Sequence, residues 1–76
     1  MTGARRKVLW ISHGAIAAIE AEQVRREWTD ERMAEALGIQ RPHWTAVRSG
    51  HRNLPFVAVC RAFAMGVPAG KLLAMP

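Results

Sequence analysis

The fifteen residues from Gly38 to Arg52, GIQRPHWTAVRSGHR, combine groups suited to phosphate with one large aromatic ring. Three arginines, two histidines, a threonine and a serine in this segment can donate hydrogen bonds. The planar fork of arginine matches both a phosphate group and the edge of guanine. The segment therefore indicates contact with nucleic acid, provided that the surrounding elements turn these groups outward.

The composition points the same way. The 76 residues include 11 Lys+Arg, nine of them arginine, against 6 Asp+Glu, which gives a formal net charge of +5. A basic excess favours an anionic partner, although a solvated cationic face produces the same count. Half of the residues are hydrophobic, so we expect one small globular domain. Its margin of stability is small, and association with a second copy would raise it.

Catalytic and metal-binding functions find little support in the sequence. Cys60 is the only cysteine, which excludes an internal disulfide and fits a reducing, cytoplasmic environment. It falls in an apolar stripe, so we expect it in the core. His43, His51 and Cys60 lack the paired spacing of metal ligands. We therefore expect no enzyme activity, no metal and no other cofactor.

The N-terminal residues 1–11 are expected to form a basic arm that carries Arg5, Arg6 and Lys7. The apolar run that follows the basic residues is interrupted by polar side chains. It is also shorter than the ~20 residues that cross a bilayer. We expect neither a signal peptide nor a membrane partner.

Residues 12–76 are expected to form a single all-α domain, a compact bundle of five helices without a sheet. The first helix should run from about Ser12, as N-cap, to Glu27. Its expected inner face is Ala17, Ala21, Val24 and Trp28, and its expected outer face is Glu20, Gln23, Arg26 and Glu27. Thr29 should cap a second helix that ends at Gly38. Met33, Ala34 and Leu37 form the inward face of that helix.

A third helix should begin at Pro42, with Arg41 as its cap, and end at Gly50. Trp44 and Val47 then face the core, and the expected outer face is Arg41, Thr45 and Arg48. The fourth helix should run from Pro55 to Gly66. Its expected apolar stripe is Phe56, Val59, Cys60, Phe63 and Ala64. The last helix begins at Pro68 and carries Leu72 and Leu73.

Three segments together resemble the helix-turn-helix family of the lambda Cro and C1 repressors, the XRE-type family. These are WTDERMAEALGI, QRPHWTAVRSGHRNLP and VCRAFAMGVPAGKLL, in the family's order and spacing. The resemblance covers about residues 28–73. The chain departs from the family pattern at Gln40, Trp44 and Arg48. The small size is similar to that of regulators carried by plasmids and phages.

The resemblance implies a lambda repressor-like DNA-binding domain whose second motif helix enters the major groove. By position, the residues that would read bases are Arg41, Pro42, Thr45, Ala46 and Arg48. By position, the residues that would bind phosphate are Gln40, Ser49, His51, Arg52 and Asn53. The implied partner is double-stranded DNA, with Arg41 as the strongest candidate for a guanine contact.

The implied function is a transcriptional regulator, expected to be a repressor that binds an inverted repeat as a homodimer. Expected residues of the dimer surface are Phe63, Leu72, Leu73 and Met75. Two alternatives remain open at this point. One is an antitoxin-like protein that also binds a protein partner, and the other is a protein-interaction module without DNA binding.

Overall fold

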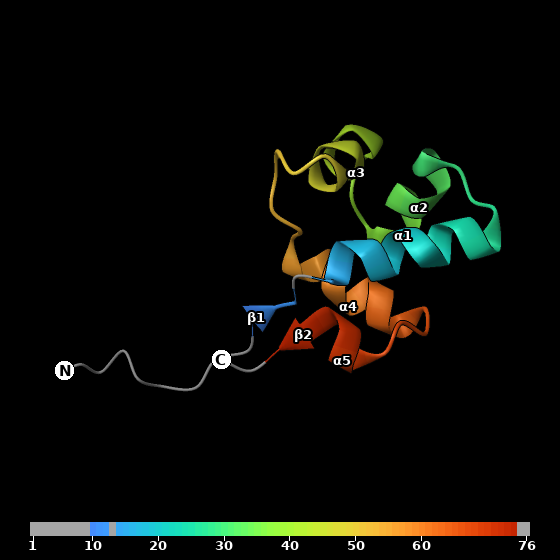
Figure 1. The fold of residues 1–76 in the computed structure, drawn as a ribbon. Helices are drawn as coiled ribbons and strands as arrows, with labels where there is room; N and C mark the ends of the chain where they lie inside the picture. The colour runs from blue at the N-terminus through green and yellow to red at the C-terminus, as the bar shows by residue number, and fades with distance from the viewer. Residues whose placement is uncertain (1–9, 13, 75–76) are drawn as a thin grey trace.

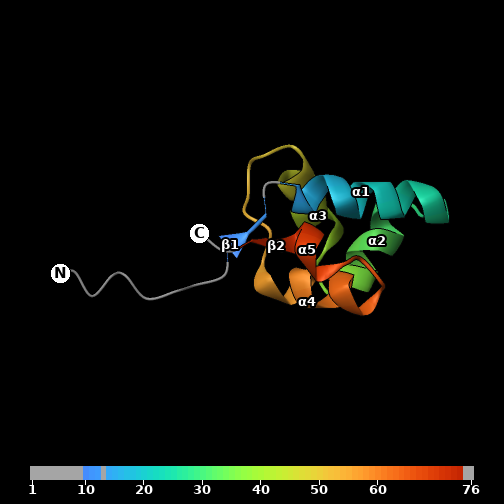
Figure 2. The ribbon, with the colours of Figure 1, turned by 60° about the horizontal axis from the view of Figure 1, so that its bottom comes forward.

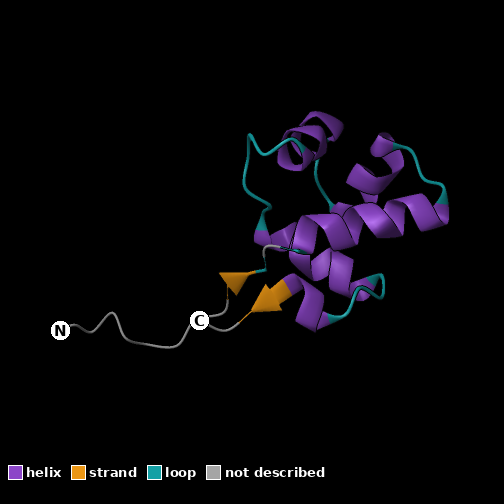
Figure 3. Ribbon diagram, in the orientation of Figure 1, coloured by secondary structure: helices purple, strands orange, loops and turns teal. Residues whose placement is uncertain are grey.

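The computed structural model describes residues 10–12 and 14–74, and this part of the chain is mostly helical (Figure 1, Figure 3). The elements in chain order are β1 (Trp10–Ile11), α1 (Ala15–Arg26), α2 (Asp30–Leu37), α3 (Arg41–Arg48), α4 (Phe56–Ala64), α5 (Ala69–Leu72) and β2 (Leu73–Ala74). The expectation of an all-α domain with five helices is therefore confirmed for the described residues. Arg5, Arg6, Lys7 and Met75 lie outside them.

The helices form one core. α2 packs against both α3 and α4, and α1 packs against α5, so α2 and α1 are the elements that join the rest (Figure 1). The largest fully buried side chains are Trp44, Ile19, Met33, Leu37, Leu72 and Val47. Trp44 and Val47 of α3 both enter this core. Their burial anchors α3 and determines which of its sides faces solvent.

A small sheet joins the two ends of the described chain, so the expectation of a bundle without a sheet was wrong. Trp10 pairs with Ala74 and Ile11 with Leu73 in antiparallel register. The Ser12 backbone N–H donates to the Leu72 carbonyl at 2.8 Å and continues this pairing. Figure 2 shows the two strands beside α5. Residues 10–11, expected in the basic arm, thus belong to the folded part of the chain.

The prediction for α1 was wrong about which face is buried. Its buried residues are Ala15, Ile19 and Gln23, whereas Val24 is 76% exposed. Ala17 and Ala21 are also exposed, and Trp28, beyond the helix, is half-buried. The helix begins at Ala15 rather than Ser12, whose hydroxyl accepts from the Gly14 N–H at 3.1 Å. Small alanines on both sides of α1 made the two faces hard to tell apart by hydropathy.

The prediction for α4 was also wrong in part. Its buried residues are Ala58, Val59 and Ala62. Four members of the expected stripe are exposed instead, namely Phe56, Cys60, Phe63 and Ala64. Cys60 is therefore a surface thiol and not a core residue. Small residues let α4 approach its neighbours closely, so its larger side chains lie on the opposite side.

The ends of α2 and α3 largely follow the predictions. The Thr29 hydroxyl accepts from the Arg32 N–H at 3.1 Å, and Gly38 ends α2 in the left-handed region at φ 77°. Met33, Ala34 and Leu37 are buried as expected. The cap of α3 is Gln40 rather than Arg41, and its side chain makes no capping hydrogen bond. The shift is one residue, because Pro42 occupies the second rather than the first helical position.

Candidate nucleic-acid interface

The two sides of α3 have opposite character. Trp44 and Val47 are completely buried, whereas Arg41 and Pro42 are exposed and Thr45 and Ala46 are half-buried. The Thr45 hydroxyl donates to the Pro42 carbonyl at 3.0 Å, so its proton is used within the helix. The predicted base-reading residues therefore share the solvent-facing part of α3.

The segment after α3 turns several polar groups toward solvent. Gly50 has a φ of 86°, and the His51 N–H donates to the Ala46 carbonyl at 2.9 Å, which closes the end of the helix. The Ser49 hydroxyl lies 2.8 Å from His51 Nδ1. All of the predicted phosphate-binding residues, Gln40, Ser49, His51, Arg52 and Asn53, are exposed.

A surface hollow of about 520 Å³ lies beside this segment. Its lining is His43, Gly50, His51, Arg52, Asn53 and Pro55. The lining thus includes three of the five predicted phosphate-binding residues together with a histidine of α3. A polar hollow with a cationic side chain suits a phosphate oxygen better than an apolar ligand.

Arg48 differs from the other predicted base-reading residues because it forms ion pairs within the chain. Its Nε lies 3.2 Å from Glu20 Oε2, and its Nη1 donates to Asp30 Oδ1. Its guanidinium carbon also lies 5.9 Å from the centre of the Trp44 ring. Arg48 thereby joins α3 to α1 and to the start of α2, and two carboxylates offset its charge.

Gln23 supports α3 from the inner side of α1, where the sequence pattern did not place it. It is 8% exposed, and its side chain links α3 to α1 and α2. Its Oε1 accepts from Trp44 Nε1 at 3.0 Å, while its Nε2 donates to the Trp28 carbonyl at 3.1 Å and to Asp30 Oδ1 at 2.8 Å. Every polar hydrogen of this amide has a partner. The spacing of Ala15, Ile19 and Gln23 at four-residue intervals is the sequence signal that places it inward.

These contacts also act on Asp30. The hydrogen bond from Gln23 holds the pKa of the Asp30 carboxyl below its usual value, and the positive charges of Arg48 and Arg41 act in the same direction. Desolvation opposes them but is outweighed. Asp30 therefore stays ionised beside α3, where it holds Arg48.

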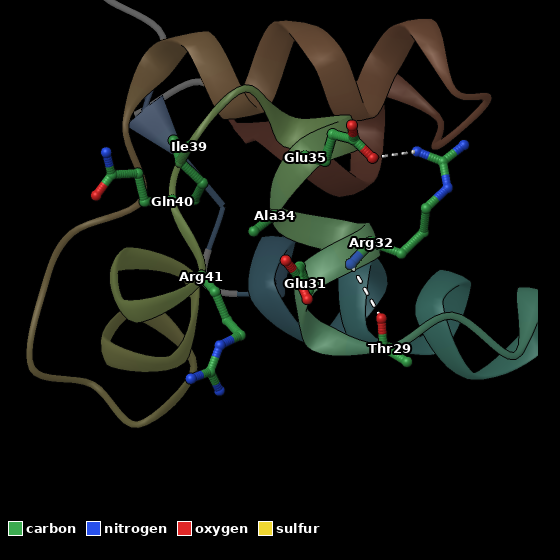
Figure 4. A pocket seen from close by; sticks show the side chains of 8 residues that line it. All are labelled: Thr29, Glu31, Arg32, Ala34, Glu35, Ile39, Gln40 and Arg41. Carbon is green, nitrogen blue, oxygen red and sulfur yellow. Dashed lines mark hydrogen bonds and ion pairs between the residues drawn. The ribbon is translucent and has the colours of Figure 1, made fainter.

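The turn between α2 and α3 borders a second hollow, of about 600 Å³. Its lining residues include Thr29, Glu31, Arg32, Gln40 and Arg41. Figure 4 shows Gln40 and Arg41 leaving the start of α3 in different directions, with Arg41 extended into solvent. The hollow is open and polar, and its carboxylates make it a poor site for an anion apart from the Arg41 side.

Stacked cations fix the turn between α1 and α2. The guanidinium carbons of Arg26 and Arg32 lie 4.9 and 4.4 Å from the centre of the Trp28 ring. Arg26 also donates to the Met65 carbonyl at 2.8 Å. Arg26 is half-buried and serves the fold, although the sequence placed it toward water. Cation–π contacts of this kind contribute about 0.5–2 kcal/mol each.

Three arginines are left without a carboxylate partner among the described residues. Four others, Arg25, Arg26, Arg32 and Arg48, form ion pairs with Glu20, Glu22, Asp30 or Glu35. The unpaired arginines are Arg41, Arg52 and Arg61. Two of these are exposed and border α3: Arg41 is its first residue, and Arg52 lies in the loop that follows it. Positive charge is therefore available on both flanks of this helix.

Neither a membrane span nor a metal cluster accompanies this surface. Within residues 10–12 and 14–74, no helix has the length and hydropathy to cross a bilayer. The same residues contain no group of three or more histidine, cysteine or acidic side chains positioned around a metal ion. Comparison with protein-family models, curated proteins and solved structures gives no match.

Proposed function

We propose that this protein is a sequence-specific DNA-binding transcriptional regulator, a repressor that binds an inverted repeat as a homodimer. In this proposal α2, the turn at Gly38 and α3 act as a helix-turn-helix, and α3 enters the major groove. The observation that carries the proposal is the pair of exposed arginines Arg41, the first residue of α3, and Arg52, in the loop after it, neither of which has a carboxylate partner among the described residues. The inward side of α3 is anchored by Trp44, which gives that surface a fixed orientation.

The proposed roles divide the surface in two. Arg41, Thr45 and Ala46 contact base edges, and Arg41 supplies a bidentate contact to guanine. Arg52 and its neighbours Ser49, His51 and Asn53, together with Gln40, contact phosphate. Pro42, the second residue of α3, lies near the bases. Arg48 is exposed but paired with Glu20 and Asp30, and it holds α3 against α1, so its contribution to DNA binding is positional.

The first experiment is selection of bound fragments from a random pool of duplexes at near-physiological salt. Enrichment of an inverted repeat with half-sites about one helical turn apart supports the proposal. The logarithm of affinity should fall with the logarithm of salt concentration with a slope of roughly −5 to −7, for three or four cationic contacts per subunit. A flat slope contradicts it.

Arginine variants then test the named surface. Arg41→Ala and Arg52→Ala should each weaken binding to the selected site by roughly 1–3 kcal/mol, and only Arg41→Ala should relax base preference. Arg25→Ala is the matched control, because Arg25 lies in a hollow with Val67, Pro68 and Lys71 on the α5 side. Equal losses for all three variants would mean that overall charge, and not this surface, determines binding.

The exposed apolar side of α4 favours a second candidate, an antitoxin-like or protein-interaction module. An antitoxin-like protein would purify with a stoichiometric protein partner. In a protein-interaction module without DNA binding, Arg41→Ala and Arg52→Ala would leave the activity unchanged. Substitution of Phe63 would abolish binding of that partner.

A further inference from the structure

The outward side of α4 is apolar and carries no charge. Phe56, Cys60 and Phe63 recur at intervals of four and three residues, so they share one side of the helix. The two phenylalanines are 62% and 60% exposed and are the only ones in the chain. Arg61, the one charged residue of α4, lies on another side, where its guanidinium is next to Gly38. Exposed aromatic side chains in such a cluster mark an interaction surface.

A groove adjoins this row of side chains. It has a volume of about 300 Å³ and lies between α4, α5 and β2. Its lining is entirely apolar in character, with Val59, Leu72 and Leu73 alongside the exposed residues of α4. The surface therefore combines protruding rings with a neighbouring hollow, a shape that can complement itself.

We infer that this face of α4, with its groove, binds a second copy of the same chain. Two chains of net charge +5 repel each other, so charge limits which faces can meet. Repulsion is smallest where the meeting surfaces hold no charged group. The face defined by Phe56, Cys60 and Phe63 meets this condition, whereas the side of α3 with its unpaired arginines does not. α3 and α4 are well separated in both Figure 1 and Figure 2, which leaves α3 accessible.

The exposed area sets the strength of the contact. A phenylalanine buries roughly 150–250 Å² when fully covered, so the two rings supply about 240 Å² per chain. A standard interface takes about 800 Å² from each partner. Cys60 and Leu73 add to the rings, but the total stays well below 800 Å². The contact is consequently a weak, reversible dimer that a DNA site with two half-sites would stabilise.

Two-fold symmetry makes the arrangement specific. When two α4 helices cross antiparallel about Cys60, each Phe56 meets the partner's Phe63, and the two Cys60 thiols lie near the axis. Leu72, which the sequence placed on the dimer surface, is completely buried within one chain and forms the floor of the groove. The role of the dimer in gene regulation rests on the proposed function, but self-association does not require DNA.

Sedimentation equilibrium of the full chain without DNA tests the inference. The wild type should pass from monomer to dimer over micromolar to submillimolar concentrations. Phe63→Ser and Phe56→Ser should each weaken association by at least about 10-fold, the loss of a central aromatic contact. Val24→Ser is the matched control, since Val24 is an exposed apolar residue of α1 outside this face. Thermal unfolding of each variant establishes that it is folded.

A second measurement leaves the sequence unchanged. Because Cys60 is the only cysteine, a bulky maleimide modifies this position alone. The modified protein should remain monomeric at concentrations where the wild type is a dimer. Raising the salt concentration should strengthen self-association by screening the like charges, while DNA binding weakens.

The outcomes separate this inference from the proposed function. If Phe63→Ser disrupts the dimer but the chain does not bind DNA, the inference is supported and the proposed function is overturned. A wild type that stays monomeric without DNA up to submillimolar concentrations, while two copies bind an inverted repeat, overturns the inference alone. Three other results also overturn the inference. They are equal effects of Phe63→Ser and Val24→Ser, a dimer that survives modification of Cys60, and a different protein bound through Phe63.

Discussion

α3 and α4 treat their aromatic side chains in opposite ways. α3 buries Trp44 completely and presents Arg41 and Pro42 to solvent. α4 buries Ala58 and Ala62 and presents Phe56 and Phe63. The contrast teaches that a large ring goes inward only where the surroundings can also satisfy its polar group and fill its volume. Gln23 does this for the indole of Trp44, and the close approach of α4 leaves no space for a ring.

The sharpest test of this contrast is truncation of each ring. Trp44→Ala should reduce the free energy of unfolding by about 3–5 kcal/mol, because it opens a cavity in the core. That loss is comparable with the whole stability of many small domains. Phe63→Ala should change it by less than about 0.5 kcal/mol, as for a surface substitution. Urea titration followed by circular dichroism measures both, and similar losses would contradict the contrast.

The next largest effect on the free energy of unfolding comes from the hydrogen bond between Gln23 and Trp44, which has no counterpart at the rings of α4. Gln23→Leu removes the acceptor of the Trp44 indole N–H and should cost about 1–3 kcal/mol, because that donor stays buried without a partner. In a Trp44→Phe background, which has no indole N–H, the same substitution should cost clearly less. A double-mutant cycle on unfolding free energies gives the coupling, and a coupling of zero would mean that the hydrogen bond does not matter.

The N-caps of α2 and α3 offer a test with a smaller expected effect. Thr29→Ala removes the hydroxyl that accepts from the Arg32 N–H at the start of α2, at a cost of about 1 kcal/mol. Gln40→Ala is the control, since Gln40 caps α3 without a side-chain hydrogen bond and should cost only a few tenths. Thermal unfolding of the two variants should therefore separate them.

The smallest expected effect is on acid stability. The pKa of Asp30 is lower in the folded chain than its usual value, so its charged form stabilises the fold at neutral pH. This contribution is lost as the pH falls below the ordinary value near 3.9. Asp30→Asn should cost less than about 1 kcal/mol at pH 7 and should flatten the pH dependence of stability below pH 4. Glu31→Gln, at an exposed site without an ion pair among the described residues, should leave that dependence unchanged.

The contrast between α3 and α4 also shows which parts of the fold can be predicted from the sequence. Thr29, Gly38 and the pair Trp44 and Val47 were read correctly, because capping chemistry and spacing are local properties of one helix. The faces of α1 and α4 were misread, because both helices have apolar residues on more than one side. Which side is buried there depends on how closely a neighbour approaches. Pairing of Trp10 with Ala74 joins residues so distant in sequence that no local pattern signals it.

The candidate site also has features that the sequence predicts and features that it does not. The sequence suggested Arg41 and Arg52 as exposed cations, and both are exposed. It could not show that Arg48 is held by Glu20 and Asp30, because these three residues belong to three different parts of the chain. Its spacing with Ala15 and Ile19 signals that Gln23 is buried, but its partners Trp28, Asp30 and Trp44 all lie on later elements or turns and could not be inferred.

The pairing of β1 with β2 has a consequence for the order in which the molecule forms. It closes a loop that contains every helix of the described residues and joins only two residue pairs, so we expect it to form late and to open early. Leu73 belongs to β2 and also lines the groove beside α4. Opening of the strand pair would thus reshape that groove while α2 and α3 remain folded. Amide hydrogen exchange at Ser12, whose N–H is bonded to Leu72, would report this opening directly.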